Sequence, residues 1–403
     1  SPLNARQCKA ITLAMSHSNH LSARRFDLDW LRIGAFALLI AYHAGMAFVS
    51  WDWHIKLARL SWLEPVMIFT NAWRLLLLFL ISGIASAAML GKGHHGFFAS
   101  RSRRLLLPLL FGVLVIVPPQ AWVEVQVKGA WAGSYAEFWR SAYFRFDDHL
   151  GLILPTWNHL WFVVYLWAYT ALLAAGLALP AGIRQRLGHG ITAALSGHRF
   201  LWLPMLAIAA VRISLASRFP ETHDLVQDWC AHLVYGGAFF LGVAMGPAGP
   251  MWAGVARWWR TGLLLGMASW AAAALISMQP GEPHGALLAG LRALRAIQAW
   301  GMIIGLLGLA RRWLAHDHRW RQPLAEAVFP AYLIHQTLIV LIAFWVLPHG
   351  LPLAAQAAIL FGGTIAGTAA FCWLTARLAW LRPLAGYGPR KAQAARPMAP
   401  RLA

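Results

Sequence analysis

Residues 30–50 read WLRIGAFALLIAYHAGMAFVS, and this stretch decides what kind of fold the chain adopts. Arg32 is its only Lys, Arg, Asp or Glu, so the segment stays apolar over about the 20 residues that a helix needs to cross the hydrocarbon core of a bilayer. Stretches of similar length and character recur along the chain. The sequence therefore predicts a protein that crosses a membrane several times.

The composition agrees with a membrane protein and excludes the usual soluble classes. Of 403 residues, 59% are hydrophobic and 12% are charged, whereas a typical globular chain is about 45–50% apolar and about 25% charged. The 23 Trp residues, many near the ends of apolar stretches, are typical of the aromatic belts at membrane interfaces. The cysteines (Cys8, Cys230 and Cys372) show no disulfide or metal-ligand spacing. We therefore exclude a soluble enzyme, a secreted disulfide scaffold and a disordered chain.

Ten stretches are candidates for membrane spans. They cover residues 30–50, 66–90, 105–123, 157–180, 200–216, 231–247, 260–278, 288–310, 327–347 and 353–375. The predicted fold class is accordingly all-α, a polytopic integral membrane bundle of about ten transmembrane helices over residues 27–378. A polar tail (1–26) precedes this domain and a basic tail (379–403) follows it. Residues 1–24 lack the apolar stretch of a cleavable signal peptide, so we expect the first span to remain as an anchor.

The distribution of charge predicts the orientation of the bundle. Lys and Arg number 34 against 14 Asp and Glu, a net charge of +20. With a cytoplasmic N-terminus, 23 of the 34 basic residues fall in cytoplasmic segments and six in outer segments, as the positive-inside rule requires. Both termini are then cytoplasmic, and the longest outer loop is 124–156. Because the bases mark topology, we expect the lipid bilayer and no nucleic acid as a partner.

Arg32 and His43 are the first candidates for a functional site. They are eleven positions apart, which puts both on one face of a helix about 16 Å from each other. Ionisable groups at membrane depth cost about 2.5–3.5 kcal/mol, so those that are present usually have a function. Asp29 lies one turn before Arg32, where its carboxylate can hold the guanidinium. For Arg32 a role as a snorkelling anchor is equally open, whereas for His43 a purely structural role is the weaker alternative.

Further polar groups lie within the spans or at their ends. Tyr332, His335 and Gln336 have i, i+3, i+4 spacing on the ninth span. Arg292 and Arg295, one turn apart on the eighth span, are either interface anchors or a grip on an anionic acceptor. The set is completed by Arg74 in the second span, His159 at the start of the fourth, His54 just outside the first, and Arg212, which we interpret as an anchor. No two histidines have H-x-x-x-H spacing on a span, so no metal site is predicted.

These residue types favour acid–base chemistry at membrane depth. A neutral imidazole in a membrane channel is a suitable general base for a sugar hydroxyl, and it can also carry an acyl group itself. Bases at the cytoplasmic mouth suit a polyanionic donor, since Arg binds phosphate through paired hydrogen bonds. The alternative is a transporter of a polar or anionic solute, in which His and Arg line the path. A third class, a structural membrane scaffold, has no use for Arg32 and His43.

Five short motifs, in order, resemble those of the membrane acyltransferase-3 family. They are residues 28–32 followed after ten residues by His43, then Leu80-Ile81-Ser82-Gly83, residues 101–108, His159-Leu160-Trp161-Phe162 and Tyr332-Leu333-Ile334-His335. The resemblance runs from about residue 27 to residue 378. Within the family it is closest to a branch of glucan succinyltransferases, that of the osmoregulated periplasmic glucan biosynthesis protein C, on account of Trp53-His54, Arg74 and Pro118-Pro119-Gln120.

The resemblance implies transfer of an acyl group from cytoplasmic acyl-CoA to a hydroxyl of an envelope glycan. It makes His43 the catalytic histidine, as base or as acyl carrier, and it counts Arg32 and Asp29 among the catalytic residues, with Arg32 also holding the CoA phosphates. The donor-binding residues it implies are Arg101, Arg103, Arg104, Tyr332 and His335, and those on the acceptor side are His54, Arg74, His159 and Trp161. Thr337 departs from the proline of many members, and Arg292 with Arg295 has no family counterpart, which leaves the acyl group and the acceptor open.

The expected partners follow from the same resemblance. The donor is succinyl-CoA or acetyl-CoA as a substrate, and no bound cofactor and no metal are expected. The acceptor is an envelope glycan, with an osmoregulated periplasmic glucan as the favoured candidate. The expected location is the inner (cytoplasmic) membrane of a bacterium, as a multi-pass protein.

Overall fold

The computed structural model describes residues 25–388, and within this range it contains helices and no strand. The α-helices are α2 (Phe26–Met46), α3 (Glu64–Asn71), α4 (Arg74–Leu90), α5 (Phe97–Phe111), α6 (Pro118–Val127), α7 (Tyr135–Glu137), α8 (Trp161–Gly176), α9 (Ala181–Ala194), α10 (Arg199–Leu215), α11 (Trp229–Ala231), α12 (Gly237–Met245), α13 (Trp252–Ser277), α14 (Gly285–Trp313), α15 (Arg321–Val346), α16 (Leu353–Arg377) and α17 (Leu381–Leu384). Short 3-10 turns (η1, Ser61–Leu63; η4, Asn158–Leu160; η6, Leu347–His349) and π-turns (η2, Gly112–Ile116; η3, Phe138–Ala142; η5, His232–Gly236) join or extend them. The predicted all-α class is confirmed.

Each of the ten predicted spans coincides with helix in the structure. Among the described residues, seven helical stretches are long and apolar enough to cross a membrane, or eight if α9 and α10, bent by 101°, form one span. The stretch Trp229–Met245 is apolar but shorter, and α2 carries three charged side chains in its first two turns. The number ten and the orientation of the termini stay predictions. The tails before residue 25 and after residue 388 lie outside the described residues.

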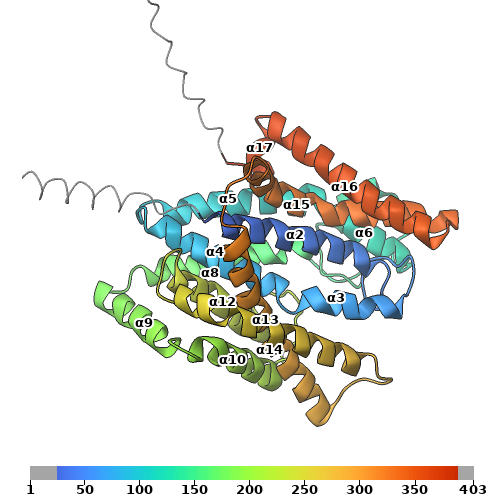
Figure 1. Cartoon of the computed structure of the whole chain (residues 1–403). Helices are drawn as coiled ribbons and strands as arrows, with labels where there is room; N and C mark the ends of the chain where they lie inside the picture. Colours follow the sequence, from blue (N-terminus) through green and yellow to red (C-terminus); the bar gives the residue numbers. More distant parts are fainter. Residues whose placement is uncertain (1–24, 389–403) are drawn as a thin grey trace, which may run out of the picture.

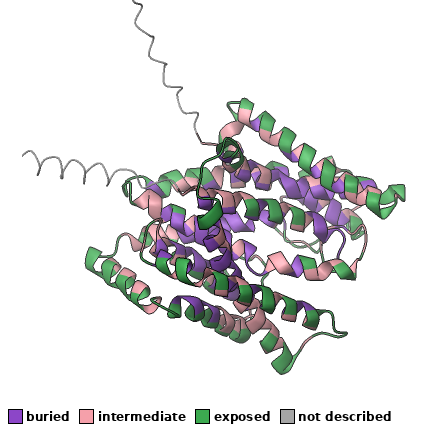
Figure 2. Ribbon diagram, in the orientation of Figure 1, coloured by how far each residue is buried: buried purple, intermediate pink, exposed green. Residues whose placement is uncertain are grey.

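The bundle has an apolar centre and an apolar surface, as a protein embedded in lipid requires. Figure 2 shows that buried residues concentrate along the middle of the bundle, and that α16 and α9–α10, at opposite edges in Figure 1, are largely exposed. Large apolar side chains on this surface are well exposed, for example Ile365 (67%), Leu264 (71%) and Leu206 (63%). Exposed apolar side chains on several helices are what contact with lipid requires.

Glycines allow the central helices to approach closely. A Cβ atom at Gly83 in α4 would lie 2.0 Å from the carbonyl oxygen of Phe239, and one at Gly242 in α12 would lie 2.1 Å from that of Leu80. Small residues at such contacts let transmembrane backbones pack against each other. The glycine of the Leu80-Ile81-Ser82-Gly83 motif is therefore explained by the crossing of α4 and α12.

A π-turn interrupts the span formed by α5 and α6, and Gln120 of α6 is fully buried. Pro108 lies inside α5, the π-turn η2 follows, and Pro118 begins α6. Breaks of this kind expose backbone carbonyls that must be satisfied inside the protein, and the Thr337 hydroxyl on α15 donates to the carbonyl of Ile116 at 2.7 Å. The helix α6 continues to Val127, four residues into the segment predicted as the loop 124–156.

Candidate active site

A polar cavity of about 520 Å³ lies among α2, α4, α8, α14 and α15 and the loops that join them. Four histidines line it, together with basic, acidic, amide and aromatic side chains. The lining residues used below are Tyr42, His43, His54, Asn71, Arg74, His159, Trp161, Arg212, Glu221, His223, Arg295, Tyr332 and Gln336. Its rim includes loop residues that the charge distribution places on the outer side of the membrane.

His43 and His335 form a direct hydrogen bond between α2 and α15. His43 Nδ1 and His335 Nε2 are 2.7 Å apart, and the two rings stack with centroids 5.0 Å apart and planes 9° from parallel. His335 is completely buried, and its Nδ1 lies 2.7 Å from the carbonyl oxygen of Tyr332, one turn earlier on α15.

The backbone carbonyl determines which nitrogens carry hydrogen. A carbonyl oxygen only accepts, so His335 Nδ1 must be the donor, and in a neutral imidazole Nε2 is then an acceptor. His43 Nδ1 must therefore donate to His335 Nε2, which leaves the Nε2 lone pair of His43 available. This atom hydrogen-bonds to no residue in the described part of the chain. The histidine pair thus orients a basic nitrogen on a residue that lines the cavity.

His159 packs against this pair without hydrogen-bonding to it. Its ring lies 5.1 Å from that of His335 in an edge-to-face arrangement, and its Nε2 is 3.2 Å from the carbonyl oxygen of Leu333, to which it donates. The backbone carbonyl of His159 accepts a hydrogen bond from the Tyr332 hydroxyl. His159 Nδ1 is buried and has no partner among the described residues. Within that range, no group of three or more His, Cys, Asp and Glu side chains is arranged to hold a metal ion.

A second histidine, His54, is oriented by a carboxylate. Its Nδ1 hydrogen-bonds to Glu124 on α6, and the other carboxylate oxygen of Glu124 lies 2.6 Å from Lys128 Nζ. His54 Nε2 is 3.0 Å from the amide nitrogen of Gln336, which also donates to Gln120 Oε1 at 3.1 Å. Gln336 therefore occupies the lone pair of His54. We call His54, Glu124, Gln120 and Gln336 the outer network.

Arg74 supplies a buried positive charge at the cavity wall. It is 2% exposed, its Nη1 donates to the Thr70 hydroxyl at 2.9 Å, and its guanidinium lies 4.1 Å from the centre of the Tyr42 ring. The Nε atom has no partner in the described part of the chain. Arg295 reaches the same wall through Asn71, with Nη2 2.7 Å from Asn71 Oδ1. The site is thus suited to an anionic group.

Residues 219–228 form a strap beside the cavity, held by Asp228. The carboxylate of this buried residue accepts from the Tyr165 hydroxyl at 2.6 Å, from the amide and hydroxyl of Thr222 at 2.9 and 2.7 Å, and from the His223 amide at 2.8 Å. Burial alone would raise the pKa of Asp228, but these hydrogen bonds outweigh burial and lower the pKa. His223, with a positive φ of 63°, stacks on Trp161 at 4.4 Å.

The site residues predicted near the cytoplasmic end of the first span, Asp29 and Arg32, lie outside the polar cavity. Asp29 Oδ2 is 2.7 Å from Arg321 Nη1, whereas Asp29 Oδ1 is 3.8 Å from Arg32 Nη2. Asp29 therefore bonds more closely to Arg321 on α15 than to Arg32 on its own helix. Arg32 Nη2 also donates to the carbonyl of Ala325 at 3.1 Å. Neither Arg32 nor Asp29 lines the polar cavity.

A separate groove of about 830 Å³ lies between α5 and α17. Arg103, Arg104, Arg382 and Tyr387 line it. Arg101 does not, but its Nε and Nη2 are buried without a partner among the described residues. The groove offers three guanidinium groups next to an aromatic ring, which is a suitable surface for a phosphate-rich nucleotide.

The structure brings most of the predicted residues together. His43, His54, Arg74, His159, Trp161 and Tyr332 line one cavity, and His335 bonds to His43. Arg32, Asp29, Arg101, Arg103 and Arg104 lie outside that cavity, and the roles predicted for all of these residues stay predictions.

Sequence reasoning did not assign Glu124, Gln120, Glu221, His223 or Arg212 to the site. Gln120 and Glu124 carry a detectable signal, because i, i+4 polar residues after two prolines share one face of a helix. His223 carries no signal of this kind, since it is a loop residue.

Comparison with known proteins identifies a family. Residues 25–377 match the model of acyltransferase family 3, which is described as an acyltransferase domain. No curated protein and no solved structure matches the chain.

Proposed function

Because this chain belongs to the acyltransferase-3 family and is a membrane acyltransferase, we propose that it transfers a succinyl group from cytoplasmic acyl-CoA to a hydroxyl of an envelope glycan. One observation carries the proposal. The relay from the Tyr332 carbonyl through His335 to His43 leaves a basic nitrogen in a cavity that also holds a buried arginine.

His43 Nε2 is the group that activates the acceptor. It removes the proton as the hydroxyl oxygen attacks the thioester carbonyl, the new C–O bond forms, and the C–S bond breaks. The proton on His43 Nε2 then passes to the thiolate sulfur of CoA, which balances the reaction. The same lone pair can instead attack the thioester first and carry the acyl group as an acyl-histidine. Both routes need the tautomer that His335 enforces.

Arg74 is the residue that favours succinyl over acetyl. A succinyl group has a free carboxylate, and a buried carboxylate needs a charged partner. Arg74 is buried at the wall of the cavity that contains His43, and its Nε is unsatisfied within the described residues. An acetyl group offers nothing to this arginine. The basic groove formed by Arg103, Arg104 and Arg382 is the site proposed for the phosphates of the donor.

The acceptor proposed is a glucan of the cell envelope. Trp161 and His223 present stacked rings at the cavity, and aromatic faces with neighbouring amides and acids suit a carbohydrate. Resemblance to the glucan succinyltransferase branch supports an osmoregulated periplasmic glucan and a bacterial inner-membrane location. This assignment requires the donor groove to face the cytoplasm and the polar cavity to face outward.

The direct test is a transfer assay in proteoliposomes with succinyl-CoA, acetyl-CoA and an oligoglucan acceptor. Mass spectrometry should show succinyl esters on the glucan and release of CoA. Arg74→Gln should reduce succinyl transfer by about tenfold or more and change acetyl transfer little, since one charge-assisted hydrogen-bond pair is lost. Arg218→Gln, in the outer loop, is the matched control. Solute movement without consumption of acyl-CoA would instead favour the transporter.

A further inference from the structure

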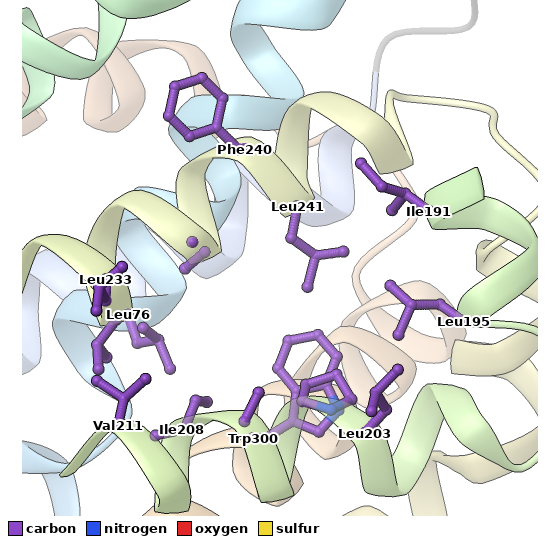
Figure 3. Close-up of a pocket in the computed structure, with 15 residues that line it drawn as sticks. Leu76, Ile191, Leu195, Leu203, Ile208, Val211, Leu233, Phe240, Leu241 and Trp300 are labelled. Carbon is purple, nitrogen blue, oxygen red and sulfur yellow. The ribbon is translucent and has the colours of Figure 1, made fainter. Parts of the chain in front are cut away.

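A second cavity, of about 320 Å³, lies between α10 and α12 and is lined entirely by apolar residues (Figure 3). Leu203, Ile208 and Val211 face it from α10, Leu241 from α12, and Trp300 of α14 closes one wall. The indole N–H of Trp300 is already bonded to the carbonyl of Phe200 at 3.0 Å. Because a water molecule needs two to four polar partners, this cavity suits hydrocarbon.

The cavity is open on the side of the molecule that faces lipid. Several residues that line it are exposed, among them Leu203 (42%), Leu233 (52%) and Phe240 (36%). A Cβ atom added at Gly237, also in the lining, would meet nothing within 4 Å. A hydrocarbon chain can therefore enter between α10 and α12 from the bilayer.

One end of the apolar cavity leads to the active site. Val234 lines it and also lines a small pocket of about 40 Å³, together with Arg212, Glu221 and Cys230. Arg212 and Glu221 in turn line the polar cavity that contains His43. Three adjoining cavities thus run from the lipid-facing surface, past a cation, to the proposed base.

Glu221 and Arg212 are the charged groups at this junction, and Glu221 accepts a hydrogen bond from the Tyr235 hydroxyl at 2.8 Å. Arg212 supplies the positive charge. It directly follows Val211 in the chain, and its guanidinium forms no hydrogen bond and no ion pair within 4.0 Å with residues 25–388. An arginine at the boundary between an apolar cavity and a polar one fits an amphiphile with an anionic head, and the planar guanidinium matches phosphate.

We propose that the apolar cavity binds the hydrocarbon chain of a lipid phosphate and that Arg212 binds the phosphate. The group joined to that phosphate then extends into the polar cavity. Resting on the proposed function, this means that the acceptor glucan is acylated while it is joined to a lipid phosphate. The lipid then determines which glycan reaches His43.

Photocrosslinking tests the binding site without any assay of transfer. The full chain in phosphatidylcholine nanodiscs is labelled with hexadecyl phosphate that carries a diazirine in the chain, or with the matching hexadecanol. We expect crosslinks on α10 and α12. Ala207→Trp, which fills the mouth of the cavity, should abolish them, whereas Ala210→Trp, an exposed alanine on the same helix outside the cavity lining, should not.

A comparison of the phosphate probe with the uncharged alcohol tests whether Arg212 binds the phosphate. The phosphate should crosslink about tenfold more than the alcohol, and Arg212→Gln should remove that preference while Arg218→Gln retains it. Equal labelling of the Ala207→Trp and wild-type proteins, or equal labelling by the two probes, would overturn the lipid-phosphate site.

A transfer assay separates the carrier role from the binding site. We expect Ala207→Trp to slow succinylation of an oligoglucan joined to polyprenyl phosphate and to leave that of a free oligoglucan unchanged. If the variant succinylates both as the wild type does, the carrier role is refuted even where crosslinking succeeds. If the wild-type protein succinylates neither, the proposed function has failed, and the crosslinking result still decides the binding site.

Discussion

Two histidines at the polar cavity, His43 and His54, are oriented in the same way but differ in the bonding of their second nitrogen. Each has its Nδ1 fixed by a partner, His335 for His43 and Glu124 for His54. The Nε2 of His54 accepts from Gln336 at 3.0 Å, whereas the Nε2 of His43 has no partner among the described residues. An oriented imidazole can act as a base only where its second nitrogen is left open, and this distinguishes His43 from His54.

The two histidines also differ in what holds them. The inner relay of Tyr332, His335 and His43 is built on α15 and α2, and His335 is fully buried. The outer network relies on α6, which follows the π-turn η2, and on His54, which lies in the loop after α2. Groups on helices, such as His43 and His335, are positioned more precisely than a group on a loop, such as His54. We therefore expect substitutions in the inner relay to affect the rate, and those in the outer network to affect acceptor binding.

Replacement of His43 should have the largest effect. His43→Ala removes the base and should lower kcat by about 10²–10⁴-fold, measured as CoA release in proteoliposomes. His54→Ala, the matched histidine variant, should reduce kcat much less because its lone pair is already occupied. Equal losses in the two variants would contradict the distinction between them.

His335 acts through His43 as a positioning residue, so its effect should be intermediate. His335→Phe keeps an aromatic ring but removes the acceptor, and loss of this hydrogen bond should lower kcat by about tenfold to a hundredfold with little change in KM. The pH at which the rate is half-maximal should also move, because the His43 tautomer is no longer fixed. His335→Gln, which can accept a hydrogen bond, should recover part of the rate; an unchanged pH profile in His335→Phe would argue for packing alone.

Substitution of Glu124 tests whether the outer network contributes to binding of the acceptor. Glu124→Gln removes a charge-assisted hydrogen bond to His54 and should raise the KM for the glucan by about tenfold while kcat stays near the wild-type value. The pH profile of kcat should be unchanged because His43 is intact. Glu137→Gln, at an exposed acid 13 positions later in the chain, serves as the control. A change confined to kcat would place Glu124 in the proton path instead.

Asp228 should have the smallest effect on catalysis and a measurable effect on stability. Its lowered pKa means that its contribution is present above about pH 3.8 and is lost as the pH falls through the folded-state pKa. Asp228→Asn weakens the hydrogen bonds to the strap and should cost about 1–3 kcal/mol at neutral pH. Thermal melts should show a lower Tm for Asp228→Asn at pH 7 and a smaller difference near pH 3. A difference that does not depend on pH would exclude the carboxylate as the cause.

Much of the fold follows from the sequence because the bilayer imposes a simple rule. A run of about 20 apolar residues forms a helix there, since each backbone amide must be bonded within its own segment. All ten predicted runs are helical in the structure, and the family motifs point to His43. The sequence did not predict where these helices become irregular. The π-turn at Gly112 and the end of α6 at Val127 lie in a part of the chain that contacts α15.

The sequence by itself determined an all-α membrane protein and its family, and it made His43 the candidate for catalysis. Only the tertiary structure decided how that histidine is oriented. His335 lies 292 positions from His43 and Glu124 lies 70 positions from His54, and helical periodicity identifies a face without specifying the neighbour it meets. The free nitrogen of His43, the occupied nitrogen of His54 and the apolar cavity that ends at Arg212 all result from how the helices pack.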